Sequence, residues 1–219
     1  MLQAANNQHL QLFSTATGDE ILRIEKYGDF GIETTAFDGR LIAFSDCKET
    51  QIFCFDKVLL KLKKLTRRIC SQNGIERLPP ASFLAFQPVE CREHEVQLVM
   101  LTKDLQICTV NVESSEISQV CDKATFEQTS EMRPYDQIVT AFHFNPVANR
   151  LVVALANKAY LSVIDLSEKN KLVWRLPALG GKGAPLVFAS DMDKLLVGYD
   201  SNHIAIFDLL KQEIHPWTA

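Results

Sequence analysis

The sequence lacks the segments that insert a protein into a membrane or export it. No apolar run approaches the roughly 20 residues that a membrane helix needs. The start of the chain, Met1 to Asn6, has neither the basic nor the apolar part of a secretory signal. We therefore expect a soluble intracellular protein that makes no membrane contact.

Motifs of catalysis and metal binding are also missing. The chain contains no Ser nucleophile elbow and no His-Glu-x-x-His zinc motif. The turn Gly180-Gly181-Lys182-Gly183 does not have the spacing of a P-loop, so we interpret it as a connecting loop rather than a phosphate site. Acidic residues are scattered in turns. We expect no catalytic residue, no cofactor, no metal and no small-molecule substrate.

Cysteines and histidines show no ligand spacing either. None of the six cysteines stands in a C-x-x-C pair. Cys54, Cys108 and Cys121 lie in apolar or alternating runs, where a thiol packs as a small hydrophobic group, so reduced structural thiols are favoured over a disulfide framework. His143, between two phenylalanines, fits a core or channel-lining position better than a catalytic base.

The composition is that of a folded protein, with 47% hydrophobic and 23% charged residues. The formal net charge of -4 predicts no attraction of the whole chain to nucleic acid, although a local patch can still bind it.

One short apolar segment recurs five times. The copies are His9 to Phe13, Gln51 to Phe55, Gln106 to Val110, Tyr160 to Ile164 and His203 to Phe207. Their last residues are 42, 55, 54 and 43 positions apart. A propeller blade of four antiparallel strands takes about 40–45 residues, so two intervals fit and two carry insertions.

A β-rich run and a polar turn precede most copies, and an alternating run follows. This order predicts an all-β chain, a partial WD40-like β-propeller of about four to five blades. We place the blades at residues 1–26 (incomplete), 29–66, 81–122, 137–177 and 184–219. Since this number does not close a seven-blade ring, we expect a fragment of a longer protein, or a partner that completes the ring.

The segments between blades have loop composition. Residues 67–80 contain Pro79, Pro80 and Gly74 and are predicted to be a loop, residues 122–136 are polar, and residues 88–95 lengthen a hairpin.

Polar residues recur at one position of the repeat. Asp56, Asp165 and Asp208 each follow the recurring segment, and Ser14 and Asn111 stand at the same place. A single active site would not need copies, so we expect these side chains to accept hydrogen bonds from turn amides. His9 and His203 open two copies and are likewise interpreted as structural.

One cluster of charge stands out. Six cations fall within residues 57–68 with no acid among them: Lys57, Lys61, Lys63, Lys64, Arg67 and Arg68. Strand alternation turns Lys61 and Lys63 to solvent. Two interpretations stay open, an edge strand kept soluble by lysines and a contact for RNA phosphate or an acidic partner.

The repeats resemble degenerate WD repeats. The Gly-His dipeptide is absent, and Trp-Asp is replaced by Phe55-Asp56, Ile164-Asp165 and Phe207-Asp208. More narrowly, the last blade, Leu195 to Thr218 with its Trp217-Thr218 step, resembles the matching blade of cirhin-like WD-repeat proteins. The strand from Val139 and the block 39–64 resemble the second propeller of that family.

This resemblance implies a non-enzymatic scaffold of the small-subunit processome in the nucleolus, supporting pre-rRNA processing and 18S rRNA maturation. It implies other processome proteins as partners, and contact of the basic stretch with pre-rRNA or the U3 small nucleolar RNA. Two alternatives remain: a general WD-repeat adaptor in ubiquitin ligation, trafficking or chromatin, and a propeller enzyme with a metal or acid–base site in its channel.

Overall fold

The computed structural model describes residues 2–5, 9–25, 31–89, 92–121, 139–145, 150–155, 160–166, 173–177, 185–191 and 193–216. The chain divides into two compact units, residues 1–119 and 120–219. Each unit consists of antiparallel sheets in which strands follow one another in chain order.

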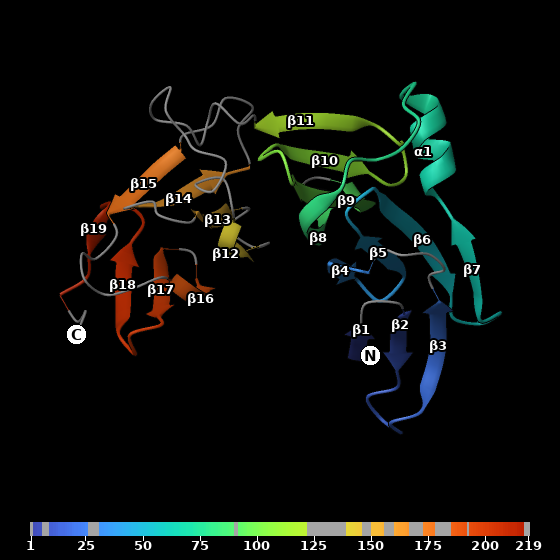
Figure 1. Ribbon diagram of the computed structural model, residues 1–219, viewed down its shortest axis with the longest axis horizontal. Coiled ribbons are helices and arrows are strands. Elements are labelled where there is room, and N and C mark those ends of the chain that lie inside the picture. The colour runs from blue at the N-terminus through green and yellow to red at the C-terminus, as the bar shows by residue number, and fades with distance from the viewer. Residues whose placement is uncertain are drawn as a thin grey trace. The chain divides into compact units, whose positions relative to one another are not determined.

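The first unit contains three sheets and one helix (Figure 1). The three-stranded sheet consists of β1 (Leu2–Ala5), β2 (His9–Phe13) and β3 (Glu20–Glu25). The next consists of β4 (Thr34–Phe37), β5 (Leu41–Ser45), β6 (Thr50–Asp56) and β7 (Lys61–Lys64). Helix α1 (Thr66–Gln72) follows, then β8 (Ala81–Val89), β9 (Arg92–Thr102), β10 (Ile107–Asn111) and β11 (Ile117–Cys121).

The second unit contains two four-stranded sheets. One consists of β12 (Val139–Asn145), β13 (Arg150–Leu155), β14 (Tyr160–Asp165) and β15 (Val173–Pro177). The other consists of β16 (Pro185–Ser190), β17 (Lys194–Tyr199), β18 (Ile204–Asp208) and β19 (Glu213–Ile214). In every four-stranded sheet of either unit, the recurring segment lies on the third strand, as its position in the repeat predicts.

Strand β5 shows why the inner strands are continuously apolar. All five of its residues are buried. Ile42 and Phe44 pack toward the first sheet with Leu10 and Leu12, whereas Leu41 and Ala43 belong to the cluster that includes α1 and the β8–β11 sheet. Because successive side chains of a strand point to opposite faces, a strand between two packed neighbours needs apolar residues at every position.

The second unit repeats this packing between its two sheets. Val152 and Leu161 from the first sheet form a buried cluster with Leu195, Val197 and Phe207 of the second. Strand β17 alternates between exposed and buried residues over most of its length, so the buried members share one face.

Helix α1 corrects the prediction of a loop over residues 67–80. Ile69 and Cys70 are buried on one side of the helix, and Thr66 Oγ1 accepts a hydrogen bond of 2.8 Å from Ile52 N of β6. At the end of the helix, Gly74 has φ +65°, and Ile75 N donates to Cys70 O at 3.1 Å, which is a Schellman motif. A helix of seven residues is too short to stand alone or to show a periodicity, so tertiary contacts fix it.

The long β8–β9 hairpin and the connection that contains α1 together lengthen this repeat. The two strands run to Val89 and from Arg92, so the predicted lengthening over residues 88–95 extends the strands themselves. The polar segment 122–136 and the turn at residues 180–183 lie outside the described residues.

The turn after the third strand has the same conformation in four repeats. Its first residue accepts hydrogen bonds from backbone N–H groups that follow it, and its fifth residue has a positive φ. The first residues are Ser14, Asp56, Asn111 and Asp208. The fifth residues are Gly18 (φ +79°), Leu60 (φ +49°), Ser115 (φ +62°) and Gln212 (φ +55°). A type I turn followed by a left-handed residue is a common hairpin connection.

This conformation confirms the structural role predicted for Asp56 and Asp208. Asp56 Oδ1 accepts from Val58 N and Leu59 N, both at 2.9 Å. In the equivalent turn after β18, the backbone N–H groups of Lys211 and Leu210 donate to Asp208 and hold its pKa below the usual value. The turn that follows Asp165 lies outside the described residues.

Candidate functional site

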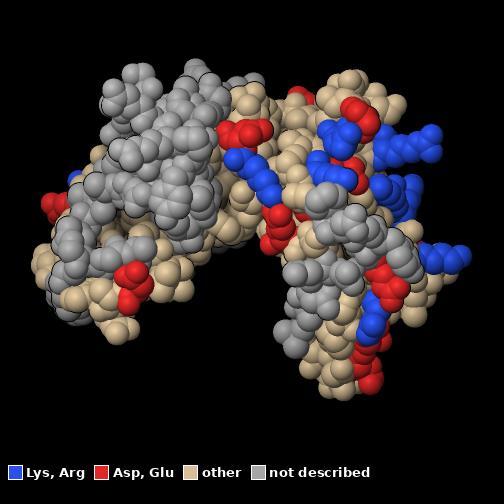
Figure 2. All heavy atoms as spheres, in the orientation of Figure 1, with Lys and Arg blue, Asp and Glu red and all other residues tan. Residues whose placement is uncertain are grey.

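The β6–β7 hairpin presents the lysines of the basic stretch. Lys61, Lys63 and Lys64 are exposed on β7, whereas Leu62 between them packs against the core of the first unit. This confirms the alternation predicted for Lys61 and Lys63. No ion pair joins these lysines to any residue that the structure describes. Figure 2 shows Lys and Arg gathered at the edge that Figure 1 labels β7 and α1.

The tip of this hairpin is apolar, a feature that the alternation of the strand does not predict. Val58, Leu59 and Leu60 are 90%, 61% and 58% exposed. Lys57 precedes them, and a Cβ on Gly39 would lie 3.8 Å from Lys57 Nζ, so this ammonium group lies beside the β4–β5 turn. The hairpin therefore carries three exposed aliphatic side chains between Lys57 and Lys61.

The two arginines of the stretch lie on α1, beyond the strand. Arg67 is exposed and lines an open cavity of about 410 Å³ with Lys64 and Arg77. Glu49 and Glu76 line the same cavity, and Glu76 forms an ion pair of 3.3 Å with Arg77. Burial raises the pKa of the Cys70 thiol at this cavity, so the thiol stays protonated. The cavity thus places Arg67 near Lys64, together with two acidic residues, and contains no activated nucleophile.

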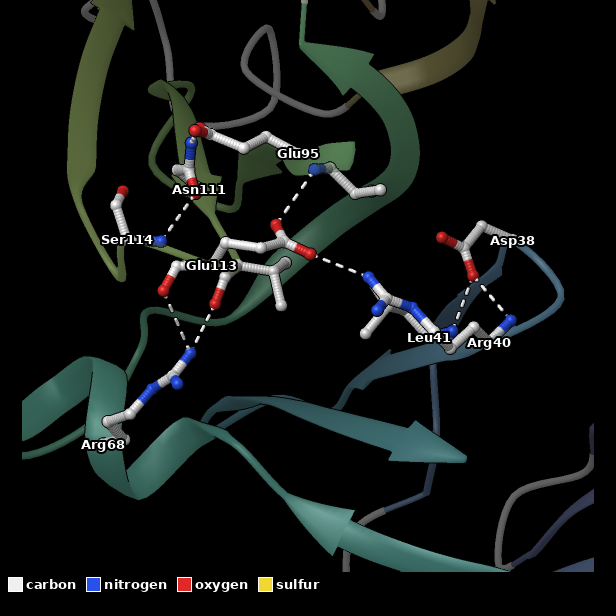
Figure 3. Close-up of polar contacts among 10 residues, drawn as sticks. Asp38, Arg40, Leu41, Arg68, Glu95, Asn111, Glu113 and Ser114 are labelled. Carbon is white, nitrogen blue, oxygen red and sulfur yellow. Dashed lines mark hydrogen bonds and ion pairs between the residues drawn. The ribbon is translucent and has the colours of Figure 1, made fainter. Parts of the chain in front are cut away.

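Arg68 belongs to the connection between two sheets instead. Its guanidinium donates to Val112 O at 2.5 Å and reaches Glu113 O at 3.5 Å, in the turn between β10 and β11 (Figure 3). Asn73, just after α1, donates to Ser115 O of the same turn at 2.6 Å. The structure therefore groups Lys57, Lys61, Lys63, Lys64 and Arg67 at the surface and assigns Arg68 a structural contact.

Glu113 completes that connection. Its carboxylate accepts from Arg40 Nη2 at 2.7 Å and from Val96 N at 2.9 Å (Figure 3). Arg40 follows Asp38, whose carboxylate accepts from the N–H groups of Arg40 and Leu41. One carboxylate thus joins the β4–β5 turn to β9. Sequence reasoning missed this contact because Arg40 and Glu113 are 73 residues apart and share no motif.

His143 and His203 each lie within hydrogen-bond distance of a serine. His143 Nε2 lies 2.9 Å from Ser190 Oγ, and Asn145 Nδ2 donates to the same hydroxyl at 2.9 Å. Burial lowers the pKa of His143, which favours the neutral ring. His203 Nδ1 lies 3.0 Å from Ser201 Oγ in the β17–β18 turn.

Within the described part of the chain, no group of three or more His, Cys, Asp or Glu residues is placed to hold a metal ion. Cys47, Cys54, Cys70 and Cys108 are free thiols. Among the described residues no helix has both the length and the apolar character needed to span a membrane.

Comparison with known proteins identifies the fold. No family model matches the sequence. No curated protein matches it either. Among solved structures, that of U3-55K is similar over 97% of this chain, with a TM-score of 0.62 and 16% sequence identity. The chain has the fold of a partial WD40-like β-propeller, as predicted.

The comparison shows the fold and leaves the family open. The chain spans 58% of the length of the U3-55K structure, and 788 solved chains match in all. A fold this widespread serves many functions, so function depends on the surface that each propeller presents. We take the β6–β7 hairpin as the candidate site, because it combines exposed lysines that have no described ion pair with exposed aliphatic side chains.

Proposed function

We propose that this chain is a non-enzymatic scaffold of ribosome biogenesis, acting in the nucleolus within the small-subunit processome. In this role it supports pre-rRNA processing and 18S rRNA maturation. One support is the resemblance of the last blade to cirhin-like proteins, which implies contact with the U3 small nucleolar RNA. The other is the fold shared with U3-55K, whose name also refers to U3.

The observation that carries the proposal is the contrast between two sets of polar groups. Acidic residues at the repeated turn position bind backbone amides, and His143 and His203 bind serines. The lysines of β7, by contrast, have no ion pair with a described residue. Exposed cations that have no ion pair among the described residues favour association with an anionic partner.

Co-purification tests the role directly. The tagged chain, expressed in cells, should recover U3 small nucleolar RNA and unprocessed pre-rRNA above the level recovered by an unrelated tagged propeller. Depletion should lower newly made 18S rRNA relative to the large-subunit rRNA in pulse-labelled cells. Recovery of ubiquitin-ligase, trafficking or chromatin proteins without pre-rRNA would refute the proposal and favour the general adaptor.

Charge reversal tests the basic stretch as a contact. Lys61→Glu, Lys63→Glu and Lys64→Glu together should weaken co-sedimentation with pre-ribosomal particles, because attraction to a polyanion depends on the number of cations. The matched control replaces the same three lysines by arginine and should co-sediment normally. Co-sedimentation that is unchanged by charge reversal would refute the contact.

A further inference from the structure

The tip of the β6–β7 hairpin differs from the equivalent turns of the other described repeats. In the turns that begin at Asn111 and Asp208, the second residue, Val112 or Leu209, is buried. In the β6–β7 turn that position is Lys57, and the aliphatic residues Val58, Leu59 and Leu60 occupy the three positions that face solvent. The turn at Ser14 has the exposed residues Ala16, Thr17 and Gly18 there. Only this one of the four described turns exposes three large aliphatic side chains.

Two unfavourable choices meet at this tip. Exposed aliphatic surface costs free energy that burial against a partner would recover. Leu60 also has φ +49°, a conformation that suits glycine or asparagine better than leucine. Ser115 and Gln212 have the same conformation at the equivalent position, so the cost belongs to the repeated turn and only the exposed aliphatic surface is particular to this tip.

The charges and side chains around the tip indicate which kind of partner fits it. Lys57, Lys61, Lys63 and Lys64 flank the aliphatic residues, and no acid lies in residues 57–68. Single-stranded RNA is held by stacking on exposed aromatic side chains as well as by cations, but the two aromatics of this hairpin are occupied: Phe55 is buried and Phe53 stacks on Phe44 with ring centroids 5.6 Å apart. Aliphatic side chains beside lysines instead complement a segment that has both apolar and acidic residues.

We propose that the β6–β7 hairpin docks an acidic protein segment that alternates aliphatic and carboxylate side chains. This inference rests on the proposed scaffold function and names the partner of its basic surface. Val58 and Leu59 contact the aliphatic residues of the segment, and Lys61 and Lys63 pair with its carboxylates. β7 is the edge strand of its sheet, so an extended segment can lie along it.

Peptide binding to the purified full chain tests the proposal by fluorescence anisotropy. The probes are a short labelled peptide that alternates Glu with Leu, the same peptide with Ser in place of Leu, a single-stranded RNA of equal charge, and phosphatidylserine vesicles. The Glu–Leu peptide should bind at least about tenfold more tightly than the Glu–Ser peptide, a difference of about 1.4 kcal/mol. Equal binding of the two peptides, or tighter binding of RNA or vesicles, would overturn the proposal.

Variants locate the site. Val58→Ser with Leu59→Ser should reduce binding of the Glu–Leu peptide to the level of the Glu–Ser peptide, and Lys61→Glu with Lys63→Glu should abolish both. The control is Leu210→Ser, which removes an equally exposed leucine from the equivalent β18–β19 turn, where Lys211 is paired with Asp208 and Glu213. Loss of binding in the control, or none in the tip variant, would refute the site.

The two proposals fail separately. The peptide comparison uses the wild-type chain alone and needs no variant to fold. A chain that recovers U3 RNA from cells but binds both peptides equally keeps the scaffold function and loses this partner. A chain that prefers the Glu–Leu peptide but recovers no pre-rRNA keeps the docking site within some other assembly.

Discussion

Replacement of Leu60 by glycine should show that the repeated turn stores strain at this position. A left-handed residue other than glycine costs about 1–2 kcal/mol, and Leu60 has φ +49°. The replacement relieves that cost, but it also loses the packing of the partly buried leucine and adds the chain entropy of glycine, which is about 0.5–1 kcal/mol. The net change in the free energy of unfolding therefore needs a reference.

Leu59→Gly is that reference. Leu59 lies in the same turn and is 61% exposed, against 58% for Leu60, but its φ is not positive. Both variants lose similar packing and gain similar entropy, so their difference isolates the backbone strain. Leu60→Gly should be more stable than Leu59→Gly by about 1–2 kcal/mol. For a unit of this size that is a difference in Tm of roughly 4–8 °C.

Thermal and urea unfolding, followed by circular dichroism, measure both variants against the wild type. Equal destabilisation by the two replacements would show that Leu60 is not strained. A Leu60→Gly variant that loses more stability than Leu59→Gly would show that leucine packing outweighs the backbone conformation.

Three further predictions concern structure away from the tip. Thr66→Val should lower the free energy of unfolding by about 1–2 kcal/mol in urea titrations, because Ile52 N loses its buried acceptor. Thr66→Ser keeps the hydroxyl and should cost less stability. Equal losses in the two variants would refute this prediction. Glu113→Gln should lower the free energy of unfolding by less than about 1 kcal/mol, since its partner Arg40 is half exposed. The difference from the wild type should shrink in 1 M salt. A larger loss that does not depend on salt would contradict a surface ion pair. Below the unfolded-state pKa of about 6.5, the unfolded chain takes up a proton that half-buried His143 resists. Stability should therefore fall as the pH drops from about 7 toward the lower folded pKa. His143→Gln should flatten this dependence, and an unchanged slope would refute it.

The sequence predicts the strands and the repeated turn because both depend on local patterns. The recurring apolar segment has the alternation and bounding turns of a strand, and Asp56 and Asp208 have a side chain that can bind amides two and three residues later. Helix α1 was missed because seven residues carry too little periodicity. The end of the helix did have a signal in the sequence. Asn73 and Gly74, which we interpreted as loop residues, end the helix and form its Schellman motif.

The candidate site was predictable only in part. The charges of residues 57–68 and the exposure of Lys61 and Lys63 followed from composition and alternation. The structural role of Arg68 did not, because its partner Val112 lies on another sheet. The exposed tip at Val58 was also hidden, since an apolar run beside a strand normally predicts burial.

In the turn after the third strand, some of the five positions fix the backbone and others can vary. The first residue and the fifth fix the path of the backbone, whichever side chains stand between them. Where the residues between them are exposed and do not bind another sheet as Glu113 does, selection can change them and give each turn a different attachment point. Transplanting Val58 to Leu60 onto residues 210–212, with buried Leu209 kept, should carry the exposed aliphatic tip to another sheet while the host sheet keeps its register.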